Sequence, residues 1–227
     1  MIVLLLATAA YGQINRYERG TPEWYNAMAK QQIVELKNSV ILFRLPTNAI
    51  AIEAARKKGL SRTAARMESE LRTKNLETIK ALREGFTFCR IYFFYADETE
   101  KIMQRRLDEV QWLSDSLTVD PSVVIPTENF FTAELTLLRA DTLRTRTGQE
   151  TRRDEEGRQV QVPTYTSGPD PMFEAIIIKS DQFIQLHRPF PYYSRTFNSL
   201  PFRRSMKKVV RMLNENLELF YRQSSGS

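Results

Sequence analysis

Helical and strand-like spacings of apolar residues alternate through the first half of the chain. Thr21, Pro22 and Glu23 form a helix start, because a threonine hydroxyl caps free amides, proline fits the first turn and an acidic side chain complements the helix dipole. We therefore predict a helix over 22–37. The continuous apolar run at 40–45 then predicts a strand that is covered on both faces.

The following segments predict two helices, a strand and a further helix. A helix over 48–58 stops at a glycine, and a longer helix over 61–84 stops at another. The run at 86–95 is rich in aromatic residues and predicts a central strand. A helix is expected after Asp97, because apolar residues between 102 and 113 recur at helical spacing.

A strand, a long helical segment and a second strand build parallel pairing, because neighbouring parallel strands need a connection of about a dozen residues. In the second half we expect shorter antiparallel strands, and Ser180 and Asp181 favour a hairpin turn between the last two. The strands expected there are 123–125, 130–138, 159–162, 174–178 and 183–186. A closing helix over 205–222 completes the prediction. The fold class is α/β with an α+β second half: a mixed sheet with a parallel strand–helix–strand core, a β-hairpin and a C-terminal helix.

The N-terminal residues have the pattern of an export signal. An apolar run at 2–10 is followed by small residues, Ala10 and Gly12, at the positions that precede a cut before Gln13. No basic residue precedes the run. The alternatives are therefore that the true start codon lies upstream, or that residues 2–10 form a buried strand or helix. We predict a signal peptide over 1–12 and a periplasmic or secreted protein, with no transmembrane segment.

One domain is expected over 13–223, because its length and its contents of 11% aromatic and 26% charged residues are typical of a globular protein. Residues 140–157 are almost wholly polar and carry both signs of charge, which predicts an exposed hairpin tip or a mobile loop. The tail at 224–227 is expected to be disordered.

Cysteine and histidine, which commonly perform catalysis or bind metals, each occur once in the chain. The single cysteine, Cys89, excludes an intramolecular disulfide, and its apolar surroundings favour an inert buried thiol. The single histidine, His187, follows a predicted strand and is followed by a cation, which favours an edge position over a catalytic triad. The acidic residues at 97–100 favour helix capping over calcium ligation. Because zinc sites and phosphate-binding loops need more ligands or clustered glycines, we predict no metal and no cofactor.

Two stretches of the chain, FTFCRIYFFY at 86–95 and IKSDQFIQLHRPFPYY at 178–193, resemble a group of uncharacterised exported bacterial proteins. The resemblance runs from about Lys37 to Leu217 and implies export and an α/β fold, but no catalytic residue. The expected order of elements also resembles that of a thioredoxin-like domain. The redox pair of cysteines is absent, so the resemblance is one of architecture.

The net charge of +6 is concentrated at the C-terminal end, where eight cations and two anions follow from Arg188 onward. A proline-stiffened aromatic loop is followed there by cations near the start of the last helix, which oppose the helix dipole unless an anion compensates. We call this stretch, 188–208, the basic aromatic segment. The candidate binding residues are Arg188, Tyr192, Tyr193, Arg195, Arg203, Arg204 and Lys207. The alternative is that the aromatic residues pack on the sheet edge while the cations are solvated.

The predicted function is that of an exported, non-catalytic binding or structural protein. Its partner would be an anionic small molecule, an acidic protein surface or an anionic envelope polymer; export argues against nucleic acid. The alternative is a hydrolase or transferase with carboxylates such as Asp97. Its site would lie at the carboxyl ends of the parallel strands, near Thr47, Asn48, Tyr95 and Asp97, although these residues also suit helix capping.

Overall fold

The computed structural model describes residues 17–127, 129–138, 146–153, 159–165, 172–197 and 204–225. The predicted signal peptide at 1–12 and Arg203 lie outside the described residues, as do 140–145 and 154–157 of the polar segment and 226–227 of the tail. Among the described helices, none has the length and apolar character needed to cross a bilayer.

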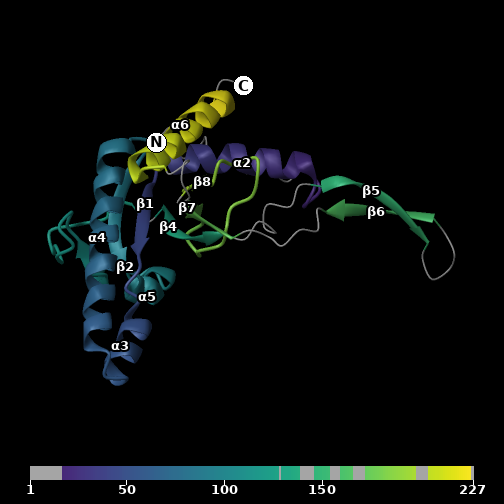
Figure 1. Ribbon diagram of the computed structural model, residues 1–227. Helices are drawn as coiled ribbons and strands as arrows, with labels where there is room; N and C mark the ends of the chain where they lie inside the picture. The colour runs from purple at the N-terminus through teal and green to yellow at the C-terminus, as the bar shows by residue number, and fades with distance from the viewer. Residues whose placement is uncertain are drawn as a thin grey trace.

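A six-stranded mixed sheet forms the centre of the protein, with strand order β3-β2-β1-β4-β7-β8 (Figure 1). The strands are β1 (Val40–Leu45), β2 (Arg90–Tyr95), β3 (Trp112–Leu113), β4 (Phe130–Leu138), β7 (Phe173–Lys179) and β8 (Tyr193–Arg195). β1 pairs in parallel with both β2 and β4, and the remaining pairs are antiparallel. The predicted α/β class and the parallel pairing across the long helical connection are therefore confirmed.

Three helices cover one face of this sheet: α2 (Pro22–Lys37), α4 (Ser61–Gly85) and α6 (Met206–Ser225) (Figure 1). α2 has the predicted boundaries because the Thr21 hydroxyl accepts a hydrogen bond from the Trp24 amide at 3.3 Å and proline occupies the first turn. α4 and α6 approach closely at Gly85, where an added Cβ would lie 3.2 Å from Val210.

The two faces of the sheet follow from the alternation of side chains along each strand. Ile41 and Phe43 of β1 point to the helices, and we call this side the helical face. Leu42 and Arg44 point the other way, to the side that we call the opposite face. There a second, smaller cluster packs Leu42 against Ile102 of the short helix α5 (Thr99–Met103).

A separate two-stranded antiparallel sheet, β5 (Arg146–Arg153) with β6 (Gln159–Tyr165), projects from the body (Figure 1). Part of the polar segment predicted as a hairpin tip or a mobile loop is therefore a strand of a hairpin. The strand predicted at 159–162 is present and extends to Tyr165.

The helix predicted after Asp97 is wrong in most of its length. A 3-10 turn (Ala96–Glu98) and α5 are followed by Arg105 in the left-handed region, with φ of 58°, which ends the helix. A second 3-10 turn (Leu107–Glu109) then leads into β3, whose two residues pair with β2. The apolar spacing arose because these turns bury one side on the sheet, as a continuous helix would.

Three predicted strand assignments also need correction. Residues 86–89 are not part of β2, because α4 runs to Gly85 and the amides of Thr87 and Phe88 donate to Asn214 Oδ1 of α6 at 2.8 and 2.9 Å. Residues 123–125 form no strand. Residues 183–186 form only an isolated bridge after a tight turn at Ser180, and the chain pairs with β7 later, as β8.

The C-terminal helix is longer than predicted. α6 continues to Ser225, three residues beyond the expected end, so Ser224 and Ser225 are helical rather than part of a disordered tail. The Ser225 hydroxyl donates to the Tyr221 carbonyl at 2.7 Å, which satisfies one of the last carbonyls of the helix.

Candidate functional site

The basic aromatic segment runs along the edge strand β8 and into α6. Tyr193 and Arg195 lie opposite Ile177 and Ala175 of β7 and share the opposite face of the sheet with them. Ser194, between them, points to the helices and donates from Oγ to the Val209 carbonyl at 2.8 Å. Adjacent residues of one strand therefore serve different sides of the molecule.

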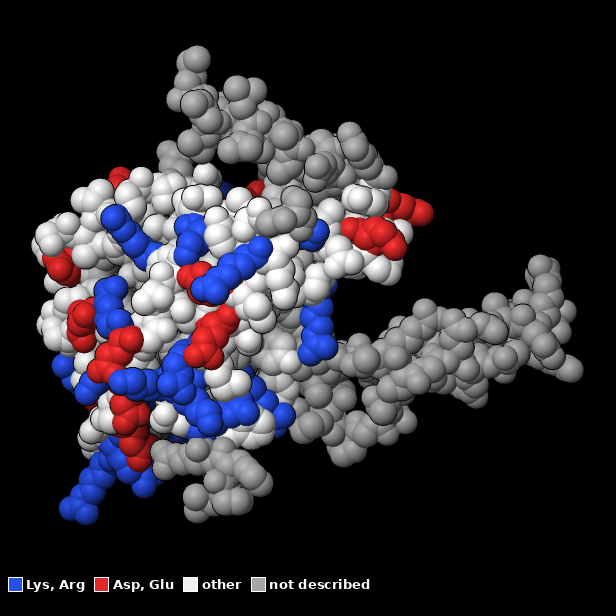
Figure 2. Space-filling model, turned by 90° about the horizontal axis from the view of Figure 1, so that it is seen from above, with Lys and Arg blue, Asp and Glu red and all other residues white. Residues whose placement is uncertain are grey.

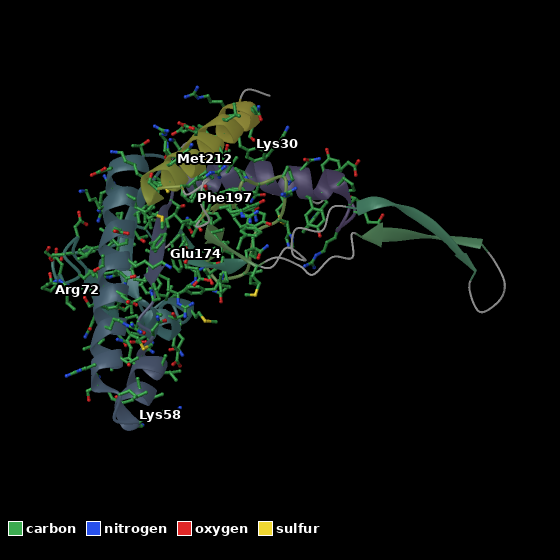
Figure 3. All side chains as sticks on the ribbon, in the orientation of Figure 1. Lys30, Lys58, Arg72, Glu174, Phe197 and Met212 are labelled. Carbon is green, nitrogen blue, oxygen red and sulfur yellow. The ribbon has the colours of Figure 1, made fainter. Side chains whose placement is uncertain are left out.

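Arg195 and Arg204 are held on aromatic rings. The guanidinium carbon of Arg195 lies 4.4 Å from the ring centre of Phe173 and 4.6 Å from that of Phe197, which is labelled in Figure 3. The guanidinium carbon of Arg204 lies 4.2 Å from the ring centre of Phe197. The Arg204 amide also donates to the Phe197 carbonyl at 2.9 Å. Neither arginine forms an ion pair with a described carboxylate, so the rings orient these charges while no described residue neutralises them.

The other predicted residues of this segment have separate environments. Arg188 is exposed and its Nη2 donates to the Tyr193 hydroxyl at 3.1 Å. Tyr192 is buried, and its burial, with a smaller effect of Tyr193, raises the pKa of its hydroxyl. Lys207 donates to Glu84 Oε2 at 2.9 Å, a contact that joins α6 to α4 and lowers the pKa of Glu84. The structure therefore brings Tyr193, Arg195 and Arg204 to one edge of the sheet, and assigns Tyr192 to the interior and Lys207 to a helix contact.

Charges of both signs mix on the surface that carries α2 and α6. Figure 2 shows lysine and arginine side chains there interspersed with carboxylates rather than gathered in one continuous field. On α6 itself, Arg211 pairs with Glu215 at 3.7 Å, and Glu218 pairs with Lys37 of α2 at 3.0 Å. Arg211 and Lys207 are thus paired with carboxylates, which distinguishes them from the stacked arginines.

A partly buried ion-pair cluster on the opposite face was not predicted from the sequence. Glu134 of β4 accepts from Arg44 Nη1 of β1 at 2.8 Å and from Lys179 Nζ of β7. Burial alone would raise the pKa of Glu134, but the hydrogen bonds and charges of Lys179 and Arg44 outweigh it and lower the pKa below 4.5. The one signal in the sequence is an acidic residue inside the apolar run at 130–138.

A cavity of about 500 Å³ lies where β1 and β2 end, between α4 and the short helix α3 (Ala49–Lys57). Of the four residues predicted there, Thr47 and Tyr95 line the cavity. The Thr47 hydroxyl donates to Asp97 Oδ1 at 3.0 Å, which engages the carboxylate proposed for a hydrolase or transferase. Asn48 precedes α3 with φ of 49° and makes no capping hydrogen bond with its side chain, so its predicted role as a cap is wrong.

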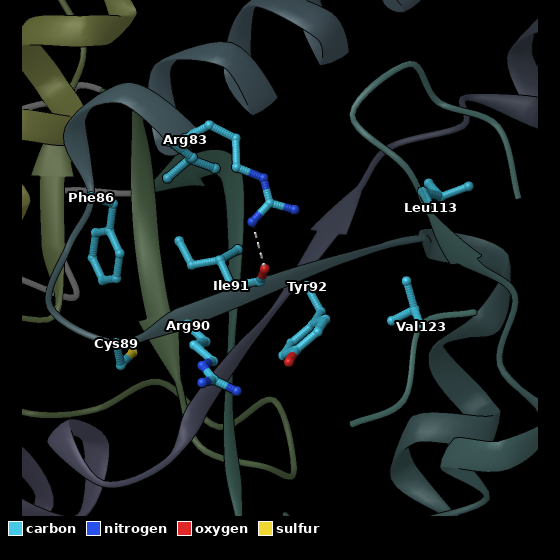
Figure 4. Close-up of a pocket in the computed structure, with 9 residues that line it drawn as sticks. Arg83, Phe86, Cys89, Arg90, Ile91, Tyr92, Leu113 and Val123 are labelled. Carbon is cyan, nitrogen blue, oxygen red and sulfur yellow. Dashed lines mark hydrogen bonds between the residues drawn. The ribbon is translucent and has the colours of Figure 1, made fainter. Parts of the chain in front are cut away.

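A smaller cavity of about 300 Å³ lies beside the start of β2 (Figure 4). Arg83 of α4 reaches over it and donates from Nη1 to the Ile91 carbonyl at 3.0 Å. Cys89 lines the same cavity, and burial raises its pKa to about 12. A thiol with this pKa stays protonated near neutral pH and is a poor nucleophile.

His187 and the acidic residues form no recognisable catalytic or metal group in the described part of the chain. The His187 ring lies 5.4 Å from the ring of Tyr25 and is exposed. No group of three or more histidine, cysteine or carboxylate side chains suited to a metal ion occurs among the residues that the structure describes. Within the described ranges, the imidazole therefore has an aromatic neighbour rather than an acid–base partner.

Comparison with known proteins adds no assignment. The chain matches no protein-family model, no curated protein and no solved structure. Function must therefore be argued from the geometry described above.

Proposed function

We propose that the protein is a non-catalytic binding protein that captures an anionic group, a carboxylate or a phosphate, through the guanidinium groups of Arg195 and Arg204. The observation that supports this most strongly is that both arginines stack on the ring of Phe197 without a described carboxylate as partner. An anion would supply the missing counter-charge.

The stacking supports binding because it orders the side chains in advance. A free arginine loses conformational entropy when it binds, whereas a guanidinium already held on an aromatic face loses less. Its planar fork still presents N–H groups to a carboxylate or phosphate, and such charge-assisted hydrogen bonds are among the stronger ones in proteins. Arg195 in particular is held between two rings, those of Phe173 and Phe197.

The proposed partners are those that present a carboxylate or a phosphate to the two arginines. An anionic small molecule, an acidic protein surface and an anionic envelope polymer all present such groups, and the edge position of β8 leaves room for a large partner. Export is part of the same proposal and rests on the apolar leader at 1–12. Cell fractionation with N-terminal sequencing of the mature protein tests it: Gln13 as the first residue supports export, and an uncleaved cytoplasmic protein contradicts it.

The binding proposal is tested with immobilised heparin as a polyanion and with inorganic phosphate in solution. Arg195→Gln with Arg204→Gln should lower the salt concentration that elutes the protein and weaken phosphate binding about tenfold or more, because two charge-assisted contacts are lost. The matched control is Arg66→Gln with Arg211→Gln, which removes the same charge from residues already paired with Glu70 and Glu215.

The two double variants distinguish binding at Arg195 and Arg204 from attraction by the net charge of the protein. If both lower retention equally, the attraction depends only on net charge and the proposed site is wrong. If the Arg195 and Arg204 variant alone loses retention while its thermal unfolding is unchanged, the proposal is supported. Phosphate and heparin together also distinguish a small anion, which needs only the two arginines, from a polymer that needs a longer surface.

A further inference from the structure

The cavity at the ends of β1 and β2 has the position expected of a ligand site. In open α/β sheets ligands bind beyond the carboxyl ends of parallel strands, and this cavity is lined by Tyr95, the last residue of β2, and by Pro46 and Thr47, which follow β1. Its volume of about 500 Å³ is within the range of small-molecule sites. It lies away from Arg195 and Arg204, which belong to the other edge of the sheet.

One part of the cavity wall is apolar. Ile52 of α3 and Leu71 of α4 line it, together with Ala49 and Pro46. Ile52 is only 5% exposed because it belongs to a small core that joins α3 to α4, so this wall is fixed by packing. Such a wall favours a ligand with an apolar body.

Another part of the wall offers polar groups that the protein itself does not use fully. Arg72 of α4 is exposed at the cavity, forms no ion pair with a described carboxylate, and makes one 3.3 Å hydrogen bond from Nη2 to the Ser116 carbonyl (Figure 3). The hydroxyl of Tyr95, which also lines the cavity, has no hydrogen-bond partner among the described residues. The buried Asn75 amide donates to the Pro46 carbonyl at 3.1 Å and so fixes the loop after β1.

The charged residues around the cavity favour a ligand with a single negative charge. Arg56 pairs with Glu68 and lies 3.9 Å from Glu53, and Lys57, outside the lining, lies 3.8 Å from Glu53. These two cations and two carboxylates therefore largely neutralise one another. Of the two arginines that line the cavity, Arg72 is then the one that no described carboxylate pairs with. One cation can balance a single carboxylate, whereas a multiply charged anion such as a phosphate ester would carry further charges that no cation of the wall is left to balance.

We infer that this cavity is a second binding site, for a small molecule with one carboxylate on a short apolar body. Its carboxylate pairs with Arg72 and accepts a hydrogen bond from the Tyr95 hydroxyl, while its apolar body lies against Ile52 and Leu71. The inference does not depend on the proposed function, because it uses different residues on different elements.

Hexanoate is the probe, titrated into the full chain by calorimetry, with hexanol as the neutral compound of the same chain length. Hexanoate should saturate one site, and hexanol should bind at least about tenfold more weakly because it cannot form the charge-assisted contact. Arg72→Gln should weaken hexanoate binding about tenfold or more and leave hexanol binding unchanged. Tyr95→Phe should weaken hexanoate binding by a smaller factor.

The control variant is Arg66→Gln, which removes an exposed cation from the same helix, where Arg66 is paired with Glu70 outside the cavity. It should bind hexanoate like the unmodified protein. Equal binding of hexanoate and hexanol, or an equal loss in the Arg66 and Arg72 variants, would overturn the inference, as would the absence of saturable hexanoate binding. If Arg72→Gln unfolds the protein, Tyr95→Phe decides the matter, since it removes only a hydroxyl that has no described partner.

Discussion

The two faces of the six-stranded sheet are made by alternate residues of the same strands, yet they hold different chemistry. On the helical face, Ile41 and Phe43 are buried beneath α2, α4 and α6 in one continuous apolar core. On the opposite face, Leu42 belongs to a small apolar cluster, and beside it Arg44 of β1 pairs with Glu134 of β4. Arg195 lies on the same face, on the edge strand β8. The comparison suggests that one face supplies most of the stability and the other most of the groups available for binding.

The largest expected effect is on the helical face. Phe43→Ala should lower the free energy of unfolding by about 3–5 kcal/mol, because a fully buried ring that packs on Phe93 at 6.1 Å is replaced by a cavity. Arg195→Ala, on the opposite face, should cost about 1 kcal/mol or less. Urea unfolding followed by circular dichroism measures both, and equal losses would refute the division between the faces.

The Glu134 cluster is where the opposite face should contribute most to stability. Glu134→Gln should cost about 3 kcal/mol, because it leaves two cations partly buried without their carboxylate. The control Glu215→Gln breaks an exposed pair with Arg211 and should cost about 0.5 kcal/mol or less. A Glu134→Gln variant as stable as the control would mean that the cluster is no more than a surface contact.

The same cluster predicts a pH dependence. Because the pKa of Glu134 is lowered from 4.5 by folding, its contribution to stability is complete above pH 4.5 and is lost as the pH falls through the lowered value. The difference in unfolding free energy between the unmodified protein and Glu134→Gln should therefore be constant near neutral pH and shrink as the pH falls below 4.5. A difference that grows on acidification has the wrong sign for this cluster.

Adjacent residues of β8 sharpen the comparison at a finer scale. Ser194→Ala removes a buried hydrogen bond to the Val209 carbonyl and should cost about 1 kcal/mol of stability without changing phosphate binding. Arg195→Gln should weaken phosphate binding and leave stability nearly unchanged. Calorimetric titration and urea unfolding on the two single variants measure both quantities. Loss of phosphate binding in Ser194→Ala, with the fold intact, would show that the two sides of β8 are not independent.

The smallest expected effect concerns Cys89, which packs against the core of the helical face. Because burial raises its pKa to about 12, alkylation by iodoacetamide near neutral pH should be at least about tenfold slower in the folded protein than in urea. Mass spectrometry of timed samples gives both rates. Rapid labelling of the folded protein would place the thiol in a solvated environment.

Prediction from the sequence succeeded where local signals agreed. The start of α2 at Pro22 follows from a threonine cap and a proline, and both act within one helical turn. The apolar run at 40–45 became β1, and the long helix after it required a parallel partner, which is β2. The segment after Asp97 failed because apolar spacing alone does not distinguish a helix from successive turns that bury the same side.

The candidate sites were predictable only in part. Charge counting found the basic aromatic segment, and Arg195 and Arg204 do lie together there. It wrongly included Tyr192, whose burial agrees with the alternative that the aromatic residues pack on the sheet edge. It also included Lys207, whose pairing with Glu84 depends on the packing of α6 against α4. At the strand ends, Arg72 was missed, since it comes from the middle of a long helix with no local mark of function.

The sequence by itself determined the order and type of most elements, the parallel pairing of β1 with β2 and the basic character of the C-terminal end, because these depend on short-range periodicity, capping and composition. Only the tertiary structure decided which cations remain without a partner, which carboxylates are neutralised and which side chains share a cavity. Ion pairs such as Arg44 with Glu134, 90 residues apart, form through strand order and register, and these are set by the packing of the whole chain.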